Sequence, residues 1–344
     1  MTRPIITQTT DSLAPPGLEA RSTAAAQWGS AQAHEVFMTD WPAMSRIELS
    51  QPPQSNVQGQ LRVAAWNIER CKKPLESSAL LRDCGIDVLL ATELDIGMAR
   101  SGQAHTPAEL ARHLGFGYAF GVEFVELGTG DTHETSFFKG HENRCGLHGN
   151  AILSRFPIRN AALIPIDDGG KWFIGAPKND GQHRVGGRMA IAAELDTPQG
   201  PLAVAAVHFE SESTPQTRAE QTQLMLVAMD SLYGDLPVVI GGDLNTATLS
   251  EDRIPKTDRL NCPQRVEPCF SLFANHGYGW QEGNTGETTT RTPPHITEER
   301  IARTLDWLFA RGCRLAEPAV IPAVFGDDDY LSDHEMVAAL VSFL

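Results

Sequence analysis

The chain has 344 residues and a formal net charge of -15, from 43 acidic against 28 basic residues, and 41% of it is hydrophobic. This apolar content supports a packed core, while no apolar run approaches the roughly 20 residues that a membrane span needs, which excludes a helical membrane protein. The acidic balance disfavours tight, non-specific binding to a nucleic-acid backbone, although a metal ion could still hold an anion locally.

The N-terminal residues 1–58 are predicted to be an extension of the main domain. They are rich in Thr, Ala, Gln, Ser and Pro without a sustained period, so we expect roughly the first thirty to form a flexible arm. Residues 33–48 carry apolar side chains that are expected to pack on the domain surface, namely Val36, Phe37, Trp41, Met44 and Ile47. The N-terminus lacks the apolar segment of a secretory signal, so the expected location is the cytoplasm.

The next part of the chain predicts strands that alternate with helices. Strands are predicted over residues 61–67, 87–93 and 118–125, and helices over residues 74–84 and 106–114. Pro74 and the pair Thr106-Pro107 are typical of helix starts. The first two strands end in the polar residues Asn67 and Glu93.

Two segments are predicted to be insertions on the surface. Residues 126–146 are polar and rich in glycine, and residues 251–300 hold few apolar runs, with a short helix predicted over 270–273. The first insertion contains acids and histidines that we expect to be solvated, with a second metal site as the alternative. These residues are Asp131, His133, Glu134, His141 and Glu142.

The remaining pattern is dominated by strands. They are predicted over residues 149–155, 160–166, 187–195, 202–208, 238–240, 304–310 and 335–343, with one amphipathic helix over 216–233. The strands 187–195 and 202–208 form a predicted hairpin. This run of strands after an initial alternation excludes a clean doubly wound fold and suits two packed sheets flanked by helices.

The cysteines are spread without a CxxC pair or zinc-like spacing. They are Cys71, Cys84, Cys145, Cys262, Cys269 and Cys313. We expect mostly free thiols in a reducing compartment. Cys262 and Cys269 flank a Pro-containing loop, and a small disulfide between them is the alternative.

The stretch Pro237–Thr246 predicts a polar site at a strand end. Its β-branched run Val238-Val239-Ile240 makes a short apolar strand, and Gly241-Gly242 are expected to end it in a tight turn. Asp243 and Asn245 are two residues apart and would project from the same side. The alternative is that both side chains only satisfy local backbone amides in a turn.

Polar side chains also lie at the ends of other predicted strands. Together with the pair above they are Asn67, Glu93, His208, Asp243, Asn245, Asp306, Asp333 and His334. Carboxylates and imidazoles are costly to bury in one place unless they pair or hold a metal. A hard oxygen ligand such as Glu93 favours Mg²⁺ or Mn²⁺. Such a metal, with an aspartate that aligns water and imidazoles that neutralise charge, suits phosphoester hydrolysis.

The polar strand ends lie in motifs that resemble those of the endonuclease/exonuclease/phosphatase superfamily, in family order from about Leu61 to Leu344. The motifs are Trp66-Asn67, Thr92-Glu93, Gly149 to Pro157, Val207-His208-Phe209, Gly241 to Asn245, Leu305-Asp306-Trp307 and Ser332-Asp333-His334. That superfamily includes pancreatic-type deoxyribonucleases, apurinic endonucleases and neutral sphingomyelinases. The resemblance implies a catalytic domain over residues 59–344 of the α/β class, a four-layer α/β sandwich in which helices flank two packed mixed sheets.

The resemblance also implies a divalent-metal site and a catalytic aspartate. Glu93 would be the metal carboxylate, with Asn67 beside it and Asp333 completing a site for Mg²⁺ or Mn²⁺, with Ca²⁺ also compatible. Asp243 would align the attacking water, and Asn245 would hold a phosphate oxygen.

Further residues would contact the substrate. His334 would contact the phosphate, oriented by Asp306, and His208 would contact the phosphoryl group from the other side. Asn150 matches a family Asn near the cleft, and Arg155 could meet phosphate. A local basic rim is expected from Lys171, Lys178, His183, Arg184 and Arg188.

Membership of such a family does not determine which substrate is hydrolysed. The segment around Asn150 is similar to that of sphingomyelinase-like members and of a broad range of bacterial members of the family. The net negative charge disfavours binding to a DNA duplex. We therefore expect hydrolysis of a small or lipid-derived phosphodiester or phosphomonoester. The alternatives are a DNA or RNA endonuclease with the same site and, from another class, a non-enzymatic binding protein on this scaffold.

Overall fold

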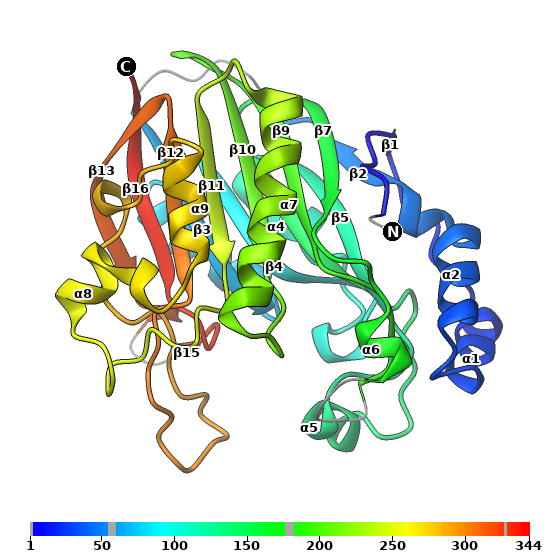
Figure 1. Cartoon of the computed structure of the whole chain (residues 1–344). Coiled ribbons are helices and arrows are strands. Elements are labelled where there is room, and N and C mark those ends of the chain that lie inside the picture. The colour runs from blue at the N-terminus through cyan, green and yellow to red at the C-terminus, as the bar shows by residue number, and fades with distance from the viewer. Residues whose placement is uncertain (1–2, 54–59, 176–181, 327–328) are drawn as a thin grey trace.

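The computed structural model describes residues 3–53, 60–175, 182–326 and 329–344. Two β-sheets pack face to face, and helices cover the outer face of each sheet (Figure 1). The predicted α/β class and the predicted sandwich of two mixed sheets flanked by helices are confirmed. No helix among the described residues is both long enough and apolar enough to cross a membrane.

The larger sheet has nine strands, and its main path runs β1-β2-β5-β6-β4-β3-β16-β13, with β8 paired to β5. Its strands are β1 (Thr9–Thr10), β2 (Ile47–Ser50), β3 (Leu61–Arg70), β4 (Val88–Ile96), β5 (Gly117–Glu126), β6 (Leu147–Ser154), β8 (Arg184–Gly186), β13 (Cys313–Ile321) and β16 (Met336–Phe343). β3 and β4 are parallel, with Asn67 opposite Thr92. The strand ends that carry Asn67 and Glu93 therefore lie side by side.

The smaller sheet has five strands in the order β12-β11-β10-β9-β7. They are β7 (Ile158–Pro165), β9 (Met189–Thr197), β10 (Gly200–His208), β11 (Val238–Asp243) and β12 (Asp306–Arg311). β9 and β10 form the predicted hairpin. His208 of β10 lies opposite Asp243 of β11, and Asp306 of β12 lies opposite Asp243 from the other side. Three polar residues thus form a row at one end of this sheet.

The helices complete the outer layers. They are α1 (Leu18–Ala26), α2 (Ala31–Asp40), α3 (Pro74–Asp83), α4 (Thr106–Leu114), α5 (Thr132–Phe137), α6 (Lys171–Ile174), α7 (Pro215–Tyr233), α8 (Lys256–Asn261), α9 (Cys269–Asn275) and the short 3₁₀ turns Pro42–Ser45, Ala99–Ser101, Pro263–Arg265 and Gln281–Gly283. α3 and α4 bury apolar side chains against the larger sheet, and α7 and α9 against the smaller one. A third apolar cluster fills the space between the sheets. A two-stranded hairpin, β14 (Val324–Phe325) with β15 (Asp329–Tyr330), lies beside β16 in sequence.

The structure corrects the expectation of a flexible N-terminal arm. β1 and β2 extend the edge of the larger sheet, and α1 and α2 lie between them in sequence. Within the first thirty residues, the backbone of Ile6 pairs with that of Leu163, and the guanidinium of Arg21 donates to the carbonyls of Asn143 and Cys145. Ile47 is fully buried, in agreement with the packing expected for residues 33–48. These elements are short and gain their burial from the sheet edge, so their sequence has no long period of its own. The predicted boundary between residues 58 and 59 lies outside the described residues.

The second insertion is packed more deeply than predicted. α9 extends the predicted short helix, and Phe270, Phe273 and Trp280 are buried against β12. Cys262 and Cys269 are both free thiols, so the alternative of a disulfide between them is wrong. β13 was not predicted, because most of its side chains are exposed or half-buried and leave too few apolar positions for a pattern.

Candidate active site

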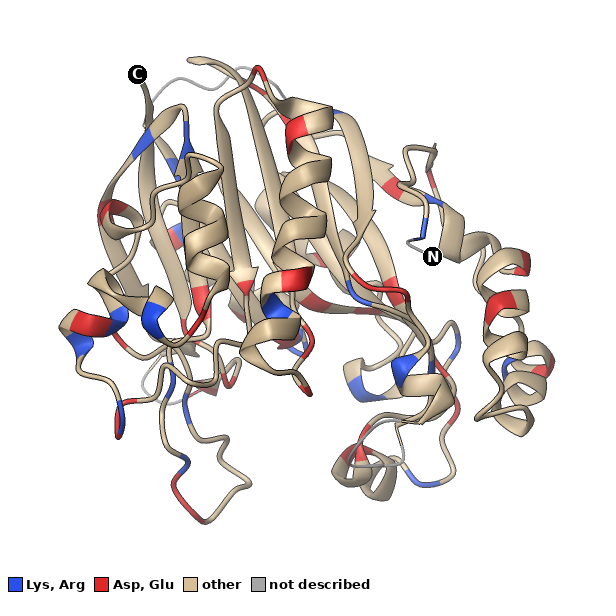
Figure 2. Cartoon of the chain, viewed as in Figure 1, with Lys and Arg blue, Asp and Glu red and all other residues tan. Residues whose placement is uncertain are grey.

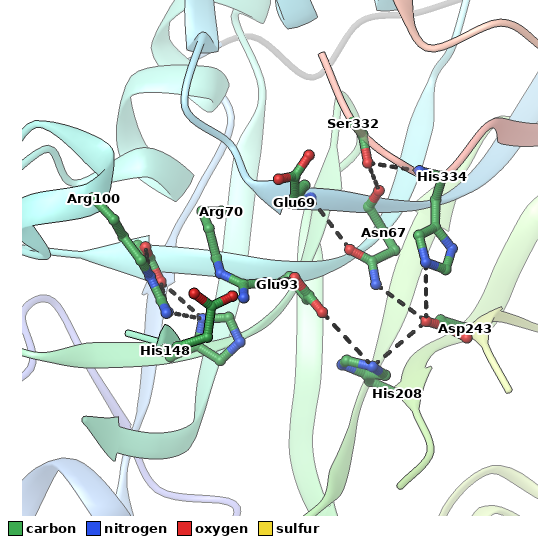
Figure 3. Close-up of polar contacts among 12 residues, drawn as sticks. Asn67, Glu69, Arg70, Glu93, Arg100, His148, His208, Asp243, Ser332 and His334 are labelled. Carbon is green, nitrogen blue, oxygen red and sulfur yellow. Dashed lines mark hydrogen bonds and ion pairs between the residues drawn. The ribbon is translucent and has the colours of Figure 1, made fainter. Parts of the chain in front are cut away.

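A cavity of about 360 Å³ opens where the carboxyl ends of β3, β4, β10 and β11 meet. Its wall includes Asn67, Glu93, Arg188, His208, Asp243, Asn245, Asp333 and His334, all of which the sequence marks as candidates. Figure 3 shows several of these side chains converging from the two sheets. The polar residues at separate strand ends therefore line one cavity.

The local backbone of β11 places Asp243 in this cavity. β11 continues through Gly241 and Gly242, which were expected to end the strand. Gly242 has a φ of 147°, and a Cβ on it would lie 1.9 Å from the carbonyl oxygen of Val207. Only glycine permits this close pairing of β10 and β11, and the pairing sets Asp243 beside His208.

The carboxylate of Asp243 is almost fully buried and held on both oxygens. Oδ2 accepts a hydrogen bond from Asn67 Nδ2 at 3.1 Å, and Oδ1 accepts one from the backbone N of Asn245 at 2.8 Å. Burial raises the pKa of Asp243 to about 6, although the neighbouring His334 cation favours the charged form. Asp243 does satisfy a local amide, as the alternative interpretation holds, but it also faces the cavity.

His334 is held by a carboxylate on the side away from the cavity. Its Nδ1 lies 2.8 Å from Oδ2 of Asp306, and its Nε2 lies 3.7 Å from Oδ2 of Asp243. Burial alone would lower the pKa of His334, but the carboxylates of Asp306 and Asp243 raise it well above its ordinary value. The ring is therefore an imidazolium at neutral pH.

Asp306 is itself held by a residue that the sequence did not single out. The hydroxyl of Thr289 donates to Asp306 Oδ2 at 2.7 Å and accepts from the backbone N of Asp306 at 3.1 Å. Thr289 lies in the second insertion, and no motif or strand end marks it. Only the tertiary fold brings it to Asp306.

His208 has the opposite electrostatic surroundings. Its Nδ1 lies 3.0 Å from a guanidinium nitrogen of Arg188, and its Nε2 lies 3.5 Å from Oδ2 of Asp243. Burial lowers the pKa of His208 well below its ordinary value, and the charge of Arg188 adds to the effect. Of the imidazoles that line the cavity, the two that flank Asp243 therefore differ in charge, with His334 favoured as the cation and His208 as the neutral ring.

Glu93 reaches the cavity from a strained position in β4. It has a φ of 62°, and Arg70 of β3, with which its carboxylate forms an ion pair, has a φ of 70°. Left-handed backbone at non-glycine residues is costly and is found preferentially at functional sites. Nε of Arg70 also lies 3.5 Å from Oε1 of Glu134 in α5. Arg70 was missed in the sequence because an arginine near a strand end is usually on the surface.

The carboxylate oxygens in the cavity are the kind of ligand that a hard divalent cation binds. The carboxylates of Glu93 and Asp333 both line it, and the ion pair with Arg70 shows that Glu93 takes a cationic partner. Burial raises the pKa of Asp333; the cations of His334 and Arg70 oppose this rise, while the nearby carboxylates of Glu69 and Asp243 add to it. A cation would offset this concentration of negative charge.

Two further observations concern which atoms could coordinate a metal ion. Oδ1 of Asn67 accepts from the backbone N of Glu69 at 3.2 Å while its Nδ2 donates to Asp243, so the side chain positions Asp243. Among the described residues, one group of potential ligand atoms, from Asp243, Asp306 and His334, lies within 4.8 Å of one another. In that group the Asp306–His334 hydrogen bond already joins two of the members.

The structure separates some candidates from the cavity. Arg155 forms an ion pair with Asp87 at the opposite end of the larger sheet, because β6 runs away from the cavity. Asn150 is fully buried within β6 and donates to the carbonyl of Met189 at 3.3 Å. Neither residue lines the cavity.

The predicted basic rim is also rearranged. Arg188 does line the cavity, but it is 3% exposed and paired with Glu123 and Glu210, so it belongs to the buried wall and not to a rim. Arg184 is likewise buried, with its guanidinium over the rings of Phe124 and Trp172. Lys178 lies outside the described residues.

The first insertion contributes to the wall without forming the alternative metal site. Asp131 lines the cavity, and Glu134 is buried and paired with Arg100 at 3.0 Å. His133 is exposed and stacks on His295 of the second insertion, with ring centroids 4.6 Å apart. Among the described residues, the group of potential metal ligands that lie close together contains no side chain of the first insertion.

A comparison with curated proteins gives no match for this chain. Solved structures of similar fold include an endonuclease/exonuclease/phosphatase from Beutenbergia cavernae, at 19% identity and a TM-score of 0.56, covering 83% of this chain and 72% of that one. The human Nocturnin catalytic domain with bound sulfate anion follows at 18% identity and a TM-score of 0.51, covering 86% and 100%. A mannosyl-6-phosphatase from Bacteroides thetaiotaomicron has 15% identity and a TM-score of 0.50, covering 82% and 100%. These likenesses show the fold.

Residues 56–334 match the model of the endonuclease/exonuclease/phosphatase family, and the chain belongs to that family.

Proposed function

We propose that the protein is a divalent-metal-dependent phosphoester hydrolase in which Asp243 aligns the attacking water. Members of the family are generally phosphoester hydrolases. The observation that carries the proposal is the place of Asp243 between two imidazoles, with its Oδ2 at 3.5 Å from Nε2 of His208 and 3.7 Å from Nε2 of His334. A phosphoryl group in this cavity would meet a base on one side and hydrogen-bond donors around it.

The residues of this chain supply base catalysis and charge stabilisation. Asp243, with its raised pKa, is a better acceptor for a proton of water than an ordinary carboxylate. His334, kept as an imidazolium by Asp306, neutralises charge that develops on a phosphoryl oxygen. Asn245 at the cavity wall holds another phosphate oxygen, while its own Nδ2 is anchored on the carbonyl of Phe209 at 2.9 Å.

Glu93 and Asp333 are the residues that would hold the metal, with Asn67 next to them. Bound Mg²⁺ or Mn²⁺ supplies Lewis-acid polarisation of the phosphoryl oxygen. Glu93 is suited to this place because its carboxylate lines the cavity, with Oε1 at 3.9 Å from Nε2 of His208.

The size and charge of the site support a small or lipid-derived phosphoester. The cavity of about 360 Å³ falls within the range of small-molecule pockets. Lys and Arg are interspersed with Asp and Glu at the end of the sheets where the loops gather (Figure 2). A duplex-binding nuclease draws on a more continuous basic surface.

The test is hydrolysis of a substrate panel with Mg²⁺, Mn²⁺ or Ca²⁺. The panel contains bis-p-nitrophenyl phosphate, sphingomyelin, inositol phosphates, mannose 6-phosphate and plasmid DNA. We expect turnover of a small or lipid-derived phosphoester that EDTA abolishes. DNA cleavage that falls steeply with rising salt would instead favour the endonuclease alternative. A protein that binds these ligands and turns over none would be the non-enzymatic alternative.

Two variants separate the mechanism from general damage. Asp243→Asn keeps the shape of the side chain but removes the base, and we expect kcat to fall by at least about 100-fold. Arg155→Ala, at the far end of the larger sheet, serves as the matched control and should leave kcat unchanged. Near-wild-type turnover by Asp243→Asn, with circular dichroism showing a folded protein, would rule out the proposed role.

A further inference from the structure

We propose that Arg188 is a positioning residue that fixes the tautomer of His208, so that Nδ1 is unprotonated and Nε2 carries the ring hydrogen toward the reacting phosphoryl group. The catalytic consequence rests on the proposed function, whereas the tautomer itself does not. The inference gives Arg188 a role different from the substrate contact that the sequence suggested.

The hydrogen bonds of Arg188 leave one assignment for His208. Nη1 of Arg188 lies 3.0 Å from Nδ1 of His208 and 3.1 Å from Oε1 of Glu123, and Nε lies 3.3 Å from Oε2 of Glu210. A guanidinium has five N–H donors and no acceptor. Nδ1 of His208 must therefore accept, and in a neutral ring the hydrogen is then on Nε2.

The position of Arg188 is well determined by its surroundings. It is 3% exposed, its backbone N donates to Oδ2 of Asp167 at 2.9 Å, and its guanidinium lies 5.4 Å from the centroid of the Phe124 ring. The two carboxylates of Glu123 and Glu210 hold the cation in place. Because the guanidinium is planar and pre-organised, little freedom is left for another hydrogen-bond pattern.

The other ring nitrogen faces the cavity. Nε2 of His208 lies 3.5 Å from Oδ2 of Asp243 and 3.9 Å from Oε1 of Glu93. An N–H at this point donates to an oxygen of a phosphoryl group bound between those carboxylates. A bare Nε2 would present a lone pair to the same oxygen and repel it. The tautomer thus decides whether His208 stabilises or opposes the developing charge.

A competing group makes the choice of tautomer depend on Arg188. Oε2 of Glu123 lies 3.7 Å from Nδ1 of His208, is buried, and has no hydrogen-bond partner among the residues that the structure describes. Without the guanidinium between them, this carboxylate would attract the hydrogen to Nδ1 and leave Nε2 bare. Many catalytic histidines are oriented by such a carboxylate, and His334 is oriented in that way by Asp306. His208 is oriented by a donor instead.

The first test reads the tautomer in the wild-type protein. Nitrogen-15 spectra of the histidine side chains are recorded near neutral pH with Mg²⁺ present, and the His208 signals are assigned by their loss in His208→Gln. We expect a protonated Nε2 and an unprotonated Nδ1. A protonated Nδ1 would overturn the proposal whether or not the protein hydrolyses any phosphoester.

The second test uses paired variants, because Arg188→Met alone leaves two buried carboxylates and could unfold the protein. In Arg188→Met we expect the hydrogen to move to Nδ1. In Arg188→Met/Glu123→Gln the new amide can donate to Nδ1, so the Nε2–H tautomer should return without the cation. Arg184→Met, which removes a neighbouring buried arginine with no contact to His208, should leave the tautomer unchanged.

The activity of these variants links the tautomer to turnover. On bis-p-nitrophenyl phosphate, Arg188→Met should lower kcat by about 10- to 100-fold with little change in KM, as loss of a supporting hydrogen bond does at other sites. The double variant should recover part of kcat. If the double variant folds and restores the tautomer but not kcat, the link to catalysis is wrong. If it folds without restoring the tautomer, the structural assignment is wrong.

Discussion

Asp306 and His334 form a buried pair in which Oδ2 of the carboxylate lies 2.8 Å from Nδ1 of the imidazole. Asp306 comes from the start of β12 in the smaller sheet, and His334 lies two residues before β16, the last strand of the larger sheet. The pair therefore joins the two sheets at the cavity. The pair also orients the imidazole of His334, because the hydrogen bond on Nδ1 turns Nε2 toward Asp243.

Removal of the Thr289 hydroxyl should weaken this pair. In Thr289→Val, Asp306 Oδ2 loses a donor at 2.7 Å and the backbone N of Asp306 loses its acceptor. We expect the free energy of unfolding to fall by about 1–3 kcal/mol and kcat to fall by about tenfold. Urea unfolding and steady-state kinetics give the two numbers. Thr285→Val is the control, at a half-buried residue whose hydroxyl accepts a hydrogen bond from the backbone N of Glu287 at 3.2 Å, away from Asp306. An equal loss in both variants would argue against a specific role of Thr289.

The stability of the protein should depend on acid through Glu134. Burial would raise the pKa of Glu134, but the cations Arg70 and Arg100 outweigh it and lower the pKa from 4.5 to about 2. A carboxylate with a lowered folded pKa stabilises the fold above its unfolded pKa, and this contribution is lost as pH falls from 4.5 toward 2.

Glu134→Gln should therefore be less stable than wild type by on the order of 3 kcal/mol near neutral pH, and the difference should shrink as pH falls below 4.5. Urea unfolding at a series of pH values measures it. Glu142→Gln, at an exposed acid in the same insertion, should show no such trend. A difference between wild type and Glu134→Gln that is constant with pH would mean that packing, and not charge, is lost.

A Cβ at position 242 should damage the fold and the site together. Gly242 has a φ of 147°, and a Cβ there would lie 1.9 Å from the carbonyl oxygen of Val207, a backbone atom that cannot move without breaking the pairing of β10 and β11. We expect Gly242→Ala to lose about 2 kcal/mol or more of stability, because strain and overpacking add. Gly279→Ala, where a Cβ would meet no atom of the described part of the chain within 4 Å, is the control in thermal unfolding.

Local patterns in the sequence predicted many of the elements correctly. The helix Thr106–Leu114 has the predicted bounds, although its cap is the side chain of His105 and not the hydroxyl of Thr106, which donates to the carbonyl of Asp95 instead. The hairpin of β9 and β10 is also as predicted. Such features depend on neighbours in the chain, so a periodic or apolar run is enough to indicate them.

The failures have a common cause. β1, β2 and β13 lie at or next to the edges of the larger sheet and gain their order from a neighbouring strand. Phe270 and Trp280 lie in a segment poor in apolar runs, yet both are buried because β12 passes beside them. An element that depends on a partner distant in sequence leaves little trace in its own composition.

The sequence by itself determined which residue types stand at the strand ends, and their order carried the resemblance to the family. It also determined that Gly242 precedes Asp243, which allows β10 and β11 to approach. Only the tertiary structure decided the charge states and contacts of the site, including the neutral His208 beside Arg188 and the separation of Arg155 from the cavity. The physical reason is that burial and the distances between charges set protonation and hydrogen bonding, and both come from strands that are far apart in the chain.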